Sequence, residues 1–224
     1  MSHIWLTLQL EAPLMSFGGE AIDQLGPTQD YPAVSMLTGL LANALGWHWN
    51  DRDALQRLQD RLIFASACLR PGEKLTDSQN AQLSKSDRAW TTHGIPEGRA
   101  GASYAAPHRR RRDYLQDGAL LVVLRLEPKD EVPSLDSVET ALFNPARPLF
   151  IGRKSCLPTA PILKKSIMAE SAHTALTLLA PKCTAIWPLG EGPDGDRVSN
   201  LTDQRNWRTD LHGGSRIAIE GRLP

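Results

Sequence analysis

Apolar residues at the start of the chain recur at every second position, at Ile4, Leu6, Leu8 and Leu10. This alternation is typical of a β-strand. The period then changes over residues 35–45, where leucines and alanines recur at the helical spacing of about 3.6 residues. A strand followed by an amphipathic helix predicts an α+β fold, in which helices pack on a sheet.

Local signals predict the ends of this first helix. Ser35 is placed to cap its N-terminus, and Gly46 stands where a glycine commonly ends a helix. A second helical stretch follows, and residues 63–69 then indicate a buried strand. The second stretch is predicted from the register of Leu55, Leu58 and Leu62.

Residues 71–118 differ in composition from the rest of the chain. They are polar, contain scattered glycines and end in a run of arginines. Because long segments of this kind inside a domain are usually functional or disordered, we interpret them as an inserted arm. The arm is expected to be a long hairpin or a partly mobile segment. Residues 119–126 (ALLVVLRL) then predict a strong strand.

The last part of the chain predicts shorter elements. Ser134 is placed to cap a helix, and four prolines with one glycine predict an ordered loop over residues 145–161. Late strands are predicted over residues 184–187 and 216–219, with a turn at 190–195.

The predicted order of elements is β-α-(α)-β, insertion, β-α, loop, β. Without the insertion this approximates the split βαβ order of a ferredoxin-like, RRM-like βαββαβ domain. We therefore expect one domain over residues 1–224, with the arm inserted at about 71–118 and a short C-terminal β extension. The sheet is expected to be antiparallel, with helices on one face.

The charges are balanced overall but segregated along the chain. The 25 Lys and Arg residues equal the 25 Asp and Glu residues, which argues against a polycation that coats nucleic acid. Residues 1–50 nevertheless contain no Lys or Arg, residues 109–112 are four arginines, and five basic residues but no acid lie between Glu139 and Glu170. This pattern indicates a defined site for a polyanion.

Other features exclude several classes of protein. No apolar run approaches the roughly 20 residues of a membrane span, and no secretory signal is seen. Cys68, Cys156 and Cys183 form an odd, scattered set, so we expect no disulfide framework and a cytoplasmic protein. CxxC and HExxH motifs are absent, so neither a metal nor another cofactor is expected.

The segment RPLFIGRKSC, residues 147–156, combines the residue types of an anion-binding loop. Gly152 permits a positive φ or a close backbone approach to a ligand, and Arg153 and Lys154 supply charge. Ser155 offers a hydroxyl, and neighbouring backbone N–H groups could form a nest for an anion. The alternative is a proline-stiffened turn whose charges are solvated.

The segment PHRRRRDYL, residues 107–115, is the second candidate. Arginine binds phosphate through two parallel hydrogen bonds, and Tyr114 could stack on a base. The alternative is a solvated charge run, in which Arg112 and Asp113 pair with each other or with a partner protein. The N-terminus of the Ser35 helix also attracts anions, but a plain capping role is favoured there.

No catalytic residue is predicted. Metal-independent RNA cleavage needs a general base and a general acid within reach of one phosphate. The candidates of suitable chemistry are Tyr31, His93, Tyr104, His108 and Tyr114. No spacing ties them together, so surface or structural roles are favoured.

Four segments taken together, in chain order, resemble the CasD family, the type I-E form of the Cas-five group in the RAMP superfamily. These segments are LTLQLEAPLMSFG (6–18), PAVSMLTGLLANALGW (32–47), RRDYL (111–115) and RPLFIGRKSCLPTAPI (147–162). The last segment is the most specific, and the resemblance is weakest over residues 71–105 and 190–212.

The resemblance implies a modified RRM-like body with a projecting thumb, which corresponds to the arm. It implies a non-catalytic subunit of the CRISPR ribonucleoprotein complex Cascade that grips the 5′ handle of crRNA in antiviral defence. The implied neighbours are the backbone subunit and the large subunit that reads the target DNA motif, so target DNA would be met only indirectly. Because a related type I-C form cleaves precursor crRNA, a metal-independent endoribonuclease stays open as an alternative. A protein–protein adaptor is the second alternative.

The resemblance also implies RNA-binding positions. By position they are Ser16, Phe17 and Gly18 after the first strand, Ser35 and Gly39 in the first helix, Arg112 and Tyr114 at the end of the thumb, and Gly152, Arg153, Lys154, Ser155 and Cys156 in the handle-side loop. The preceding Arg109, Arg110 and Arg111 are included as residues that touch either RNA or a neighbouring subunit. The arm is expected to be mobile in the isolated subunit and ordered on assembly.

Overall fold

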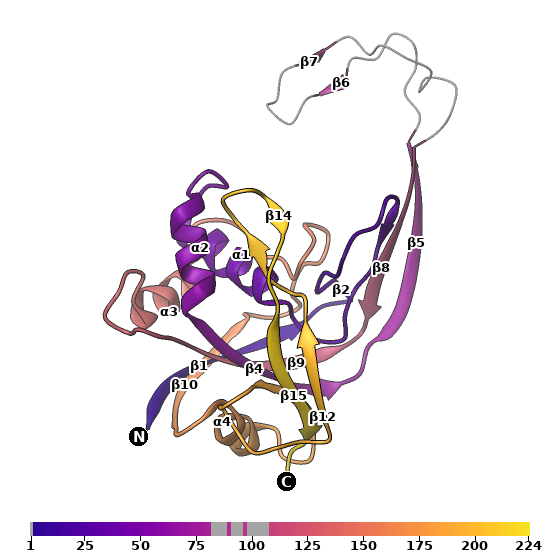
Figure 1. Ribbon diagram of the computed structural model, residues 1–224. Helices are drawn as coiled ribbons and strands as arrows, with labels where there is room; N and C mark the ends of the chain where they lie inside the picture. The colour runs from indigo at the N-terminus through magenta and orange to yellow at the C-terminus, as the bar shows by residue number, and fades with distance from the viewer. Residues whose placement is uncertain (1, 82–88, 91–95, 98–107) are drawn as a thin grey trace.

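The structure, a computed structural model, describes residues 2–81, 89–90, 96–97 and 108–224 (Figure 1). Its centre is a seven-stranded sheet in which every neighbouring pair is antiparallel. The strands are β1 (His3–Glu11), β4 (Leu62–Arg70), β9 (Ala119–Leu126), β10 (Leu163–Ala169), β11 (Thr184–Pro188), β12 (Arg197–Leu201) and β15 (Arg216–Arg222). They lie in the order β10-β1-β9-β4-β11-β15-β12. The predicted α+β class with an antiparallel sheet is confirmed.

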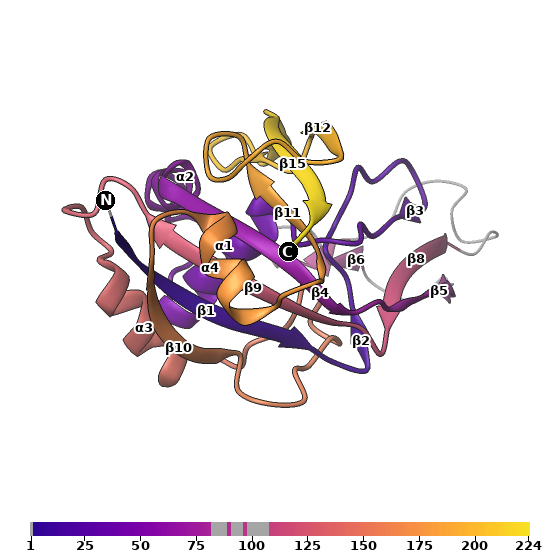
Figure 2. The same ribbon diagram turned by 90° about the horizontal axis from the view of Figure 1, so that it is seen from below.

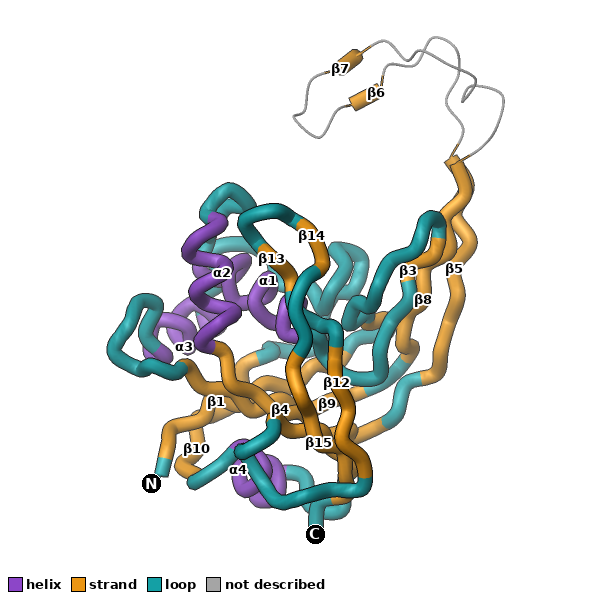
Figure 3. The backbone as a smooth tube through the Cα atoms, in the orientation of Figure 1, coloured by secondary structure: helices purple, strands orange, loops and turns teal. Residues whose placement is uncertain are grey.

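Helices cover both faces of this sheet (Figures 1 and 3). On one side lie α1 (Val34–Leu45), α2 (Arg52–Arg61) and α3 (Leu135–Phe143), and on the other lies α4 (Ala172–Leu179). Figure 2 shows α4 from its own side, where it contacts β4 and β9. The prediction of helices on one face was therefore wrong, because neither α4 nor the edge strand β10 was expected.

Because successive side chains of β1 point to opposite faces of the sheet, this strand contributes to two hydrophobic cores. Leu6, Leu8 and Leu10 are buried with α1 and α3, as the period of two predicts. On the opposite face, Trp5 is fully buried in a second core with α4, and its indole N–H donates to the carbonyl of Ala169. One strand therefore contributes side chains to the cores on both sides of the sheet.

The N-terminus of α1 is capped from the far end of the chain. The helix begins at Val34, whose N–H donates to the Asp203 carboxylate (3.3 Å), while the Ser35 N–H donates to the Asp203 carbonyl (3.2 Å). The prediction that Ser35 caps this helix was therefore wrong. The predicted end was right, since Gly46 adopts a left-handed conformation with φ of 80°.

Asp203 should consequently stabilise the fold through two contacts at once, because its buried carboxylate also accepts from Arg216 at 2.9 Å. We expect Asp203→Ala to lower the free energy of unfolding by about 2 kcal/mol, through the lost cap and the unpaired guanidinium. Asp203→Asn keeps an acceptor for Val34 and should cost about half as much. Urea unfolding measures both variants, and equal losses would show that the cap contributes nothing.

The remaining predicted elements are largely in place. Ser134 caps α3 by accepting a hydrogen bond from the Ser137 N–H (3.2 Å), and the late strands and the turn at 190–195 are present. Leu62 was assigned to the second helix, but α2 ends at Arg61 and Leu62 begins β4. The chain therefore passes from helix to strand without a connecting loop.

The described part of the arm is a β-ribbon that projects from the body (Figure 1). Strands β5 (Glu73–Ala81) and β8 (His108–Gln116) pair antiparallel over their whole length. Strand β8 also pairs with β2 (Leu14–Met15) at its base and with β3 (Leu25–Gly26) near its middle. The short strands β6 (Ala89–Trp90) and β7 (Pro96–Glu97) pair with each other. The arm is thus tied to the loop that follows β1. No helix of the described residues is long and apolar enough to cross a membrane.

Candidate nucleic-acid interface

A cavity of about 360 Å³, here called the basic groove, lies where five segments of the chain meet. They are the loop after β1, the first half of α1, the loop before Cys156, the middle of β8, and the hairpin of β13 (Arg205–Asn206) and β14 (Leu211–His212). Eight residues predicted for the site line it: Ser16, Phe17, Gly18, Ser35, Gly39, Arg112, Gly152 and Arg153. The fold therefore gathers segments that are more than one hundred residues apart in the sequence.

The charge of the basic groove has one sign. Arg112, Arg153 and Arg205 contribute positive charge to its lining, which also includes His212, and no Asp or Glu is among the described residues that line it. Cations that converge in a concave site raise the local concentration of anions and suit phosphate in particular.

Of the arginines that line the basic groove, Arg112 has the largest number of unpaired N–H donors. Its guanidinium lies beside Gly26, where an added Cβ would stand 3.0 Å from Arg112 Nη1 and 3.1 Å from Arg153 Nη2. Gly26 thus leaves room for two guanidinium groups to converge. Among the described residues, the Arg112 side chain has neither a carboxylate partner nor a carbonyl acceptor. Its N–H groups are therefore free to donate hydrogen bonds to an anion.

Arg153 has a structural role that the sequence did not indicate. Its two Nη atoms donate to the carbonyls of Asp113 (2.8 Å) and Gly26 (2.9 Å), and its guanidinium lies 4.6 Å from the centre of the Tyr114 ring. Arg153 therefore clips the 147–156 loop to the arm and to the loop after β1. Tyr114 is buried beneath it, so the expected stacking of Tyr114 on a base does not fit this structure.

The contacts that Arg153 makes with Asp113, Gly26 and Tyr114 lead to a prediction for Arg153→Lys. A lysine keeps the charge but has neither the planar fork for two carbonyls nor the flat face for Tyr114. We expect a loss of about 1–2 kcal/mol in the free energy of unfolding, measured in urea. The control is Lys154→Arg at the exposed neighbouring position, which should change stability by less than about 0.5 kcal/mol. Equal stability of the two variants would contradict the structural role of the Arg153 guanidinium.

Gly152 is needed for contact within the protein. It adopts φ of 88°, and the Ser16 N–H donates to the Ile151 carbonyl (3.2 Å) beside it. A Cβ added to Gly152 would lie 1.6 Å from the Ser16 carbonyl oxygen. The predicted positive φ is confirmed, but the group that approaches Gly152 closely is the backbone of Ser16.

The other predicted residues divide into exposed and supporting positions. Lys154 and Ser155 are exposed at the tip of the loop, and Arg109, Arg110 and Arg111 are exposed along β8. Ser16, Phe17 and Cys156 are buried, so their side chains serve mainly to shape the loops. Burial raises the pKa of the Cys156 thiol, and its backbone closes the turn with Arg153 and Ile151. As a surface contact for RNA, Cys156 does not fit this structure.

The residues of one wall of the basic groove were not predicted from the sequence. It comes from the β13–β14 hairpin, with Arg205, Trp207 and His212. Gln59 on α2 anchors it by accepting from the Arg205 N–H (3.2 Å) and the Trp207 indole N–H (3.0 Å). The Nε of Arg205 is buried without a partner among the described residues. A tryptophan and an arginine in a polar stretch carry no local signal of a site, so only the packing reveals them.

The structure does not join the catalytic candidates into one site. Tyr114 lies beneath Arg153, whereas Tyr31 lines a different cavity. His93 and Tyr104 lie outside the described residues, and only the backbone of His108 is described. No cluster of three or more potential metal ligands occurs among the described side chains.

An antiparallel sheet body with a projecting β-ribbon and a basic groove suits the binding of single-stranded nucleic acid. A family model described as CRISPR-associated protein (Cas_Cas5) matches residues 5–219. The chain therefore belongs to the Cas5 family of CRISPR-associated proteins. Over 177 residues it is 28% identical to the CRISPR system Cascade subunit CasD of Escherichia coli (strain K12), covering 79% of this chain and 77% of the relative. The resemblance to CasD is thus confirmed.

Two solved structures share the fold. A chain of a CRISPR RNA-guided surveillance complex superposes with a TM-score of 0.71 at 21% identity, covering 98% of this chain and 91% of the other. A chain from a crystal structure of a Cas protein gives a TM-score of 0.61 at 24% identity, with 98% and 95% covered. At these identities the likeness concerns the fold.

Proposed function

We propose that the protein is a non-catalytic, RNA-binding subunit of a type I-E Cascade complex that holds the 5′ handle of crRNA. The observation that carries this proposal is the acid-free basic groove, where predicted residues from four separate segments meet. Membership of the Cas5 family and the similarity to CasD support the choice of complex.

The order of the strands supports an RRM-like body for this role. Along the chain, β1, β4, β9 and β10 are separated by α1 with α2, by the arm, and by α3, and they lie side by side in the order β10-β1-β9-β4. We infer that these elements form a ferredoxin-like βαββαβ unit, to which β11, β12 and β15 are added. The arm then leaves the body between the second and third strands of this unit.

The basic groove suits an RNA single strand in chemical terms. Arg112 offers guanidinium donors to phosphate oxygens. Arg205 adds a second guanidinium, whose Nη2 is also paired with Asp210 (3.1 Å). Lys154 is exposed in the loop that contains Arg153. Gly39 leaves the helical wall open, since an added Cβ there would meet only Trp207, at 3.9 Å. A glycine within a helix costs about 1 kcal/mol relative to alanine, so close approach of a ligand would explain its presence.

The implied partners fit a subunit that holds RNA and does not cut it. The backbone and large subunits of Cascade are the proposed protein neighbours, and target DNA would be reached only through them. Holding requires oriented donors and positive charge, whereas cleavage also requires an acid and a base at one phosphate. Endoribonuclease activity is the alternative, and its candidates are Tyr31, His93, His108 and Tyr114.

One assay tests the proposal against both alternatives. Purified protein is incubated in EDTA with labelled repeat RNA and with an RNA of equal length whose handle is scrambled. We expect tighter binding to the repeat and no cleavage. Cleavage at one position, lost in His108→Ala or Tyr114→Phe with binding retained, would establish the endoribonuclease. Absence of binding, even within the assembled complex, would leave the protein–protein adaptor.

A further inference from the structure

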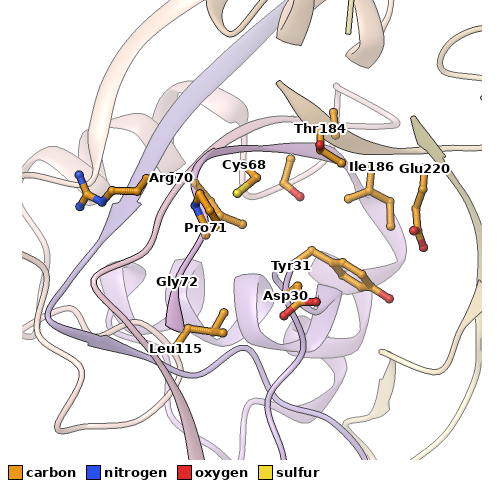
Figure 4. Close-up of a pocket in the computed structure, with 13 residues that line it drawn as sticks. Asp30, Tyr31, Cys68, Arg70, Pro71, Gly72, Leu115, Thr184, Ile186 and Glu220 are labelled. Carbon is orange, nitrogen blue, oxygen red and sulfur yellow. The ribbon is translucent and has the colours of Figure 1, made fainter. Parts of the chain in front are cut away.

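A second cavity, of about 430 Å³, shares no lining residue with the basic groove (Figure 4). Strands β4 and β11 form its floor, with Cys68 and Ile186 pointing into it, and Tyr31 and Asp30 stand opposite. Leu115 closes the end at the base of the arm. An aromatic ring therefore faces a floor that is partly apolar and partly polar.

The charge of this cavity is opposite to that of the basic groove. Asp30 and Glu220 contribute to its lining, and neither forms an ion pair with a described cation. Arg70 is the only described cation in the lining, and it is already engaged, with Nε donating to the Asp117 carbonyl (2.7 Å) and Nη2 to Glu11 (2.8 Å). The free charge in the cavity is therefore negative.

The surroundings of Tyr31 are consistent with this negative charge. Burial raises the pKa of the Tyr31 phenol, and the nearby Glu220 carboxylate raises it further, followed by Asp203 and, more weakly, Asp30. Arg216 acts in the opposite direction, but its guanidinium is paired with Asp203. The phenol ring thus lies in a field that favours a cation.

Ser66 provides a separate reason to expect a ligand. It is only 2% exposed, and its hydroxyl has no hydrogen-bond partner among the described residues. On β4 it alternates with Ala65 and Ala67 and shares a face with Cys68, so its side chain is directed into the cavity. Because this hydroxyl borders the cavity, it is available for a hydrogen bond to a polar ligand there.

We propose that this cavity binds an arginine side chain of a partner protein. The planar guanidinium would lie against Tyr31 and donate to Asp30, Glu220 and the Ser66 hydroxyl, and its aliphatic stem would lie along Ile186. Two unpaired carboxylates repel phosphate, which disfavours RNA here. That the partner is a neighbouring Cascade subunit rests on the proposed function, whereas the chemistry of the cavity does not.

The first test uses the isolated full chain. It is labelled with ¹⁵N and titrated with N-acetyl-arginine methylamide, with the neutral isostere N-acetyl-citrulline methylamide, and with guanosine monophosphate. We expect the arginine probe to shift the amide signals of Tyr31, Ser66 and Ile186, and the citrulline probe to bind at least about tenfold more weakly. Equal binding of both, no shift with arginine, or a preference for the nucleotide would overturn the proposal.

The second test uses a double variant, Asp30→Asn with Glu220→Gln. It should lose the arginine response by about tenfold or more and weaken assembly with one Cascade neighbour, while its affinity for handle RNA stays unchanged. Unchanged affinity for every neighbour would overturn the assignment of the partner. If the native chain binds the arginine probe but not the RNA, the proposed function is wrong, whereas the proposal of an arginine-binding cavity is retained.

Discussion

Replacing Gly152 by alanine is expected to destabilise the protein by more than about 3 kcal/mol and to weaken RNA binding with it. The residue adopts φ of 88°, which costs an alanine about 1–2 kcal/mol. In addition, the new Cβ would overlap the Ser16 carbonyl oxygen, so the 147–156 loop must move away from the loop after β1. That movement would displace Arg153 from the carbonyls of Gly26 and Asp113.

A matched control separates steric overlap from backbone strain. Gly190 has nearly the same φ, 87°, but an added Cβ there would meet no atom within 4 Å. Gly190→Ala should therefore cost only about 1–2 kcal/mol and leave the affinity for RNA unchanged. Urea unfolding and titration with labelled handle RNA measure both variants. Equal losses of stability would show that the contact between Gly152 and Ser16 does not constrain the loop.

The largest expected effect on RNA binding comes from combining Arg112→Gln with Arg205→Gln. These residues stand on opposite walls of the basic groove, one on β8 and the other on β13. A hydrogen bond to a charged group contributes about 1.5–3 kcal/mol, so each substitution should weaken handle binding about tenfold. The slope of log affinity against log salt should fall by roughly 0.7 for each lost phosphate contact, and so by about 1.4 for the pair.

The control for this pair is Arg197→Gln, which removes one exposed arginine on β12, outside the basic groove. Its affinity and salt dependence should match those of the native chain. The unfolding midpoint of the control should be close to the native value. The double variant should be slightly less stable, because Arg205 forms an ion pair with Asp210 (3.1 Å) and its guanidinium lies 5.1 Å from the centre of the Trp207 ring. A double variant that binds RNA like the control would show that the basic groove is not the RNA site.

Three corrections show why sequence patterns predicted the site only in part. Cys156 and Arg153 stand beside Gly152 in a motif with the chemistry of a phosphate loop, yet one is buried and the other is held by backbone carbonyls. Ser35 has the chemistry of a cap, but Asp203 takes that place. In each case the deciding contact comes from a distant segment, which local spacing does not reveal.

The sequence by itself determined the class of the fold, the first two strands of the body, the arm and the resemblance to CasD. These follow from periodicity, composition and short motifs, which act between residues close in the chain. The tertiary structure alone decided which cations face the basic groove, that the β13–β14 hairpin supplies its missing wall, and that α4 covers the second face of the sheet. Such features depend on contacts between residues far apart in the sequence, such as Val34 and Asp203, which are 169 positions apart, and these contacts form only when the chain packs.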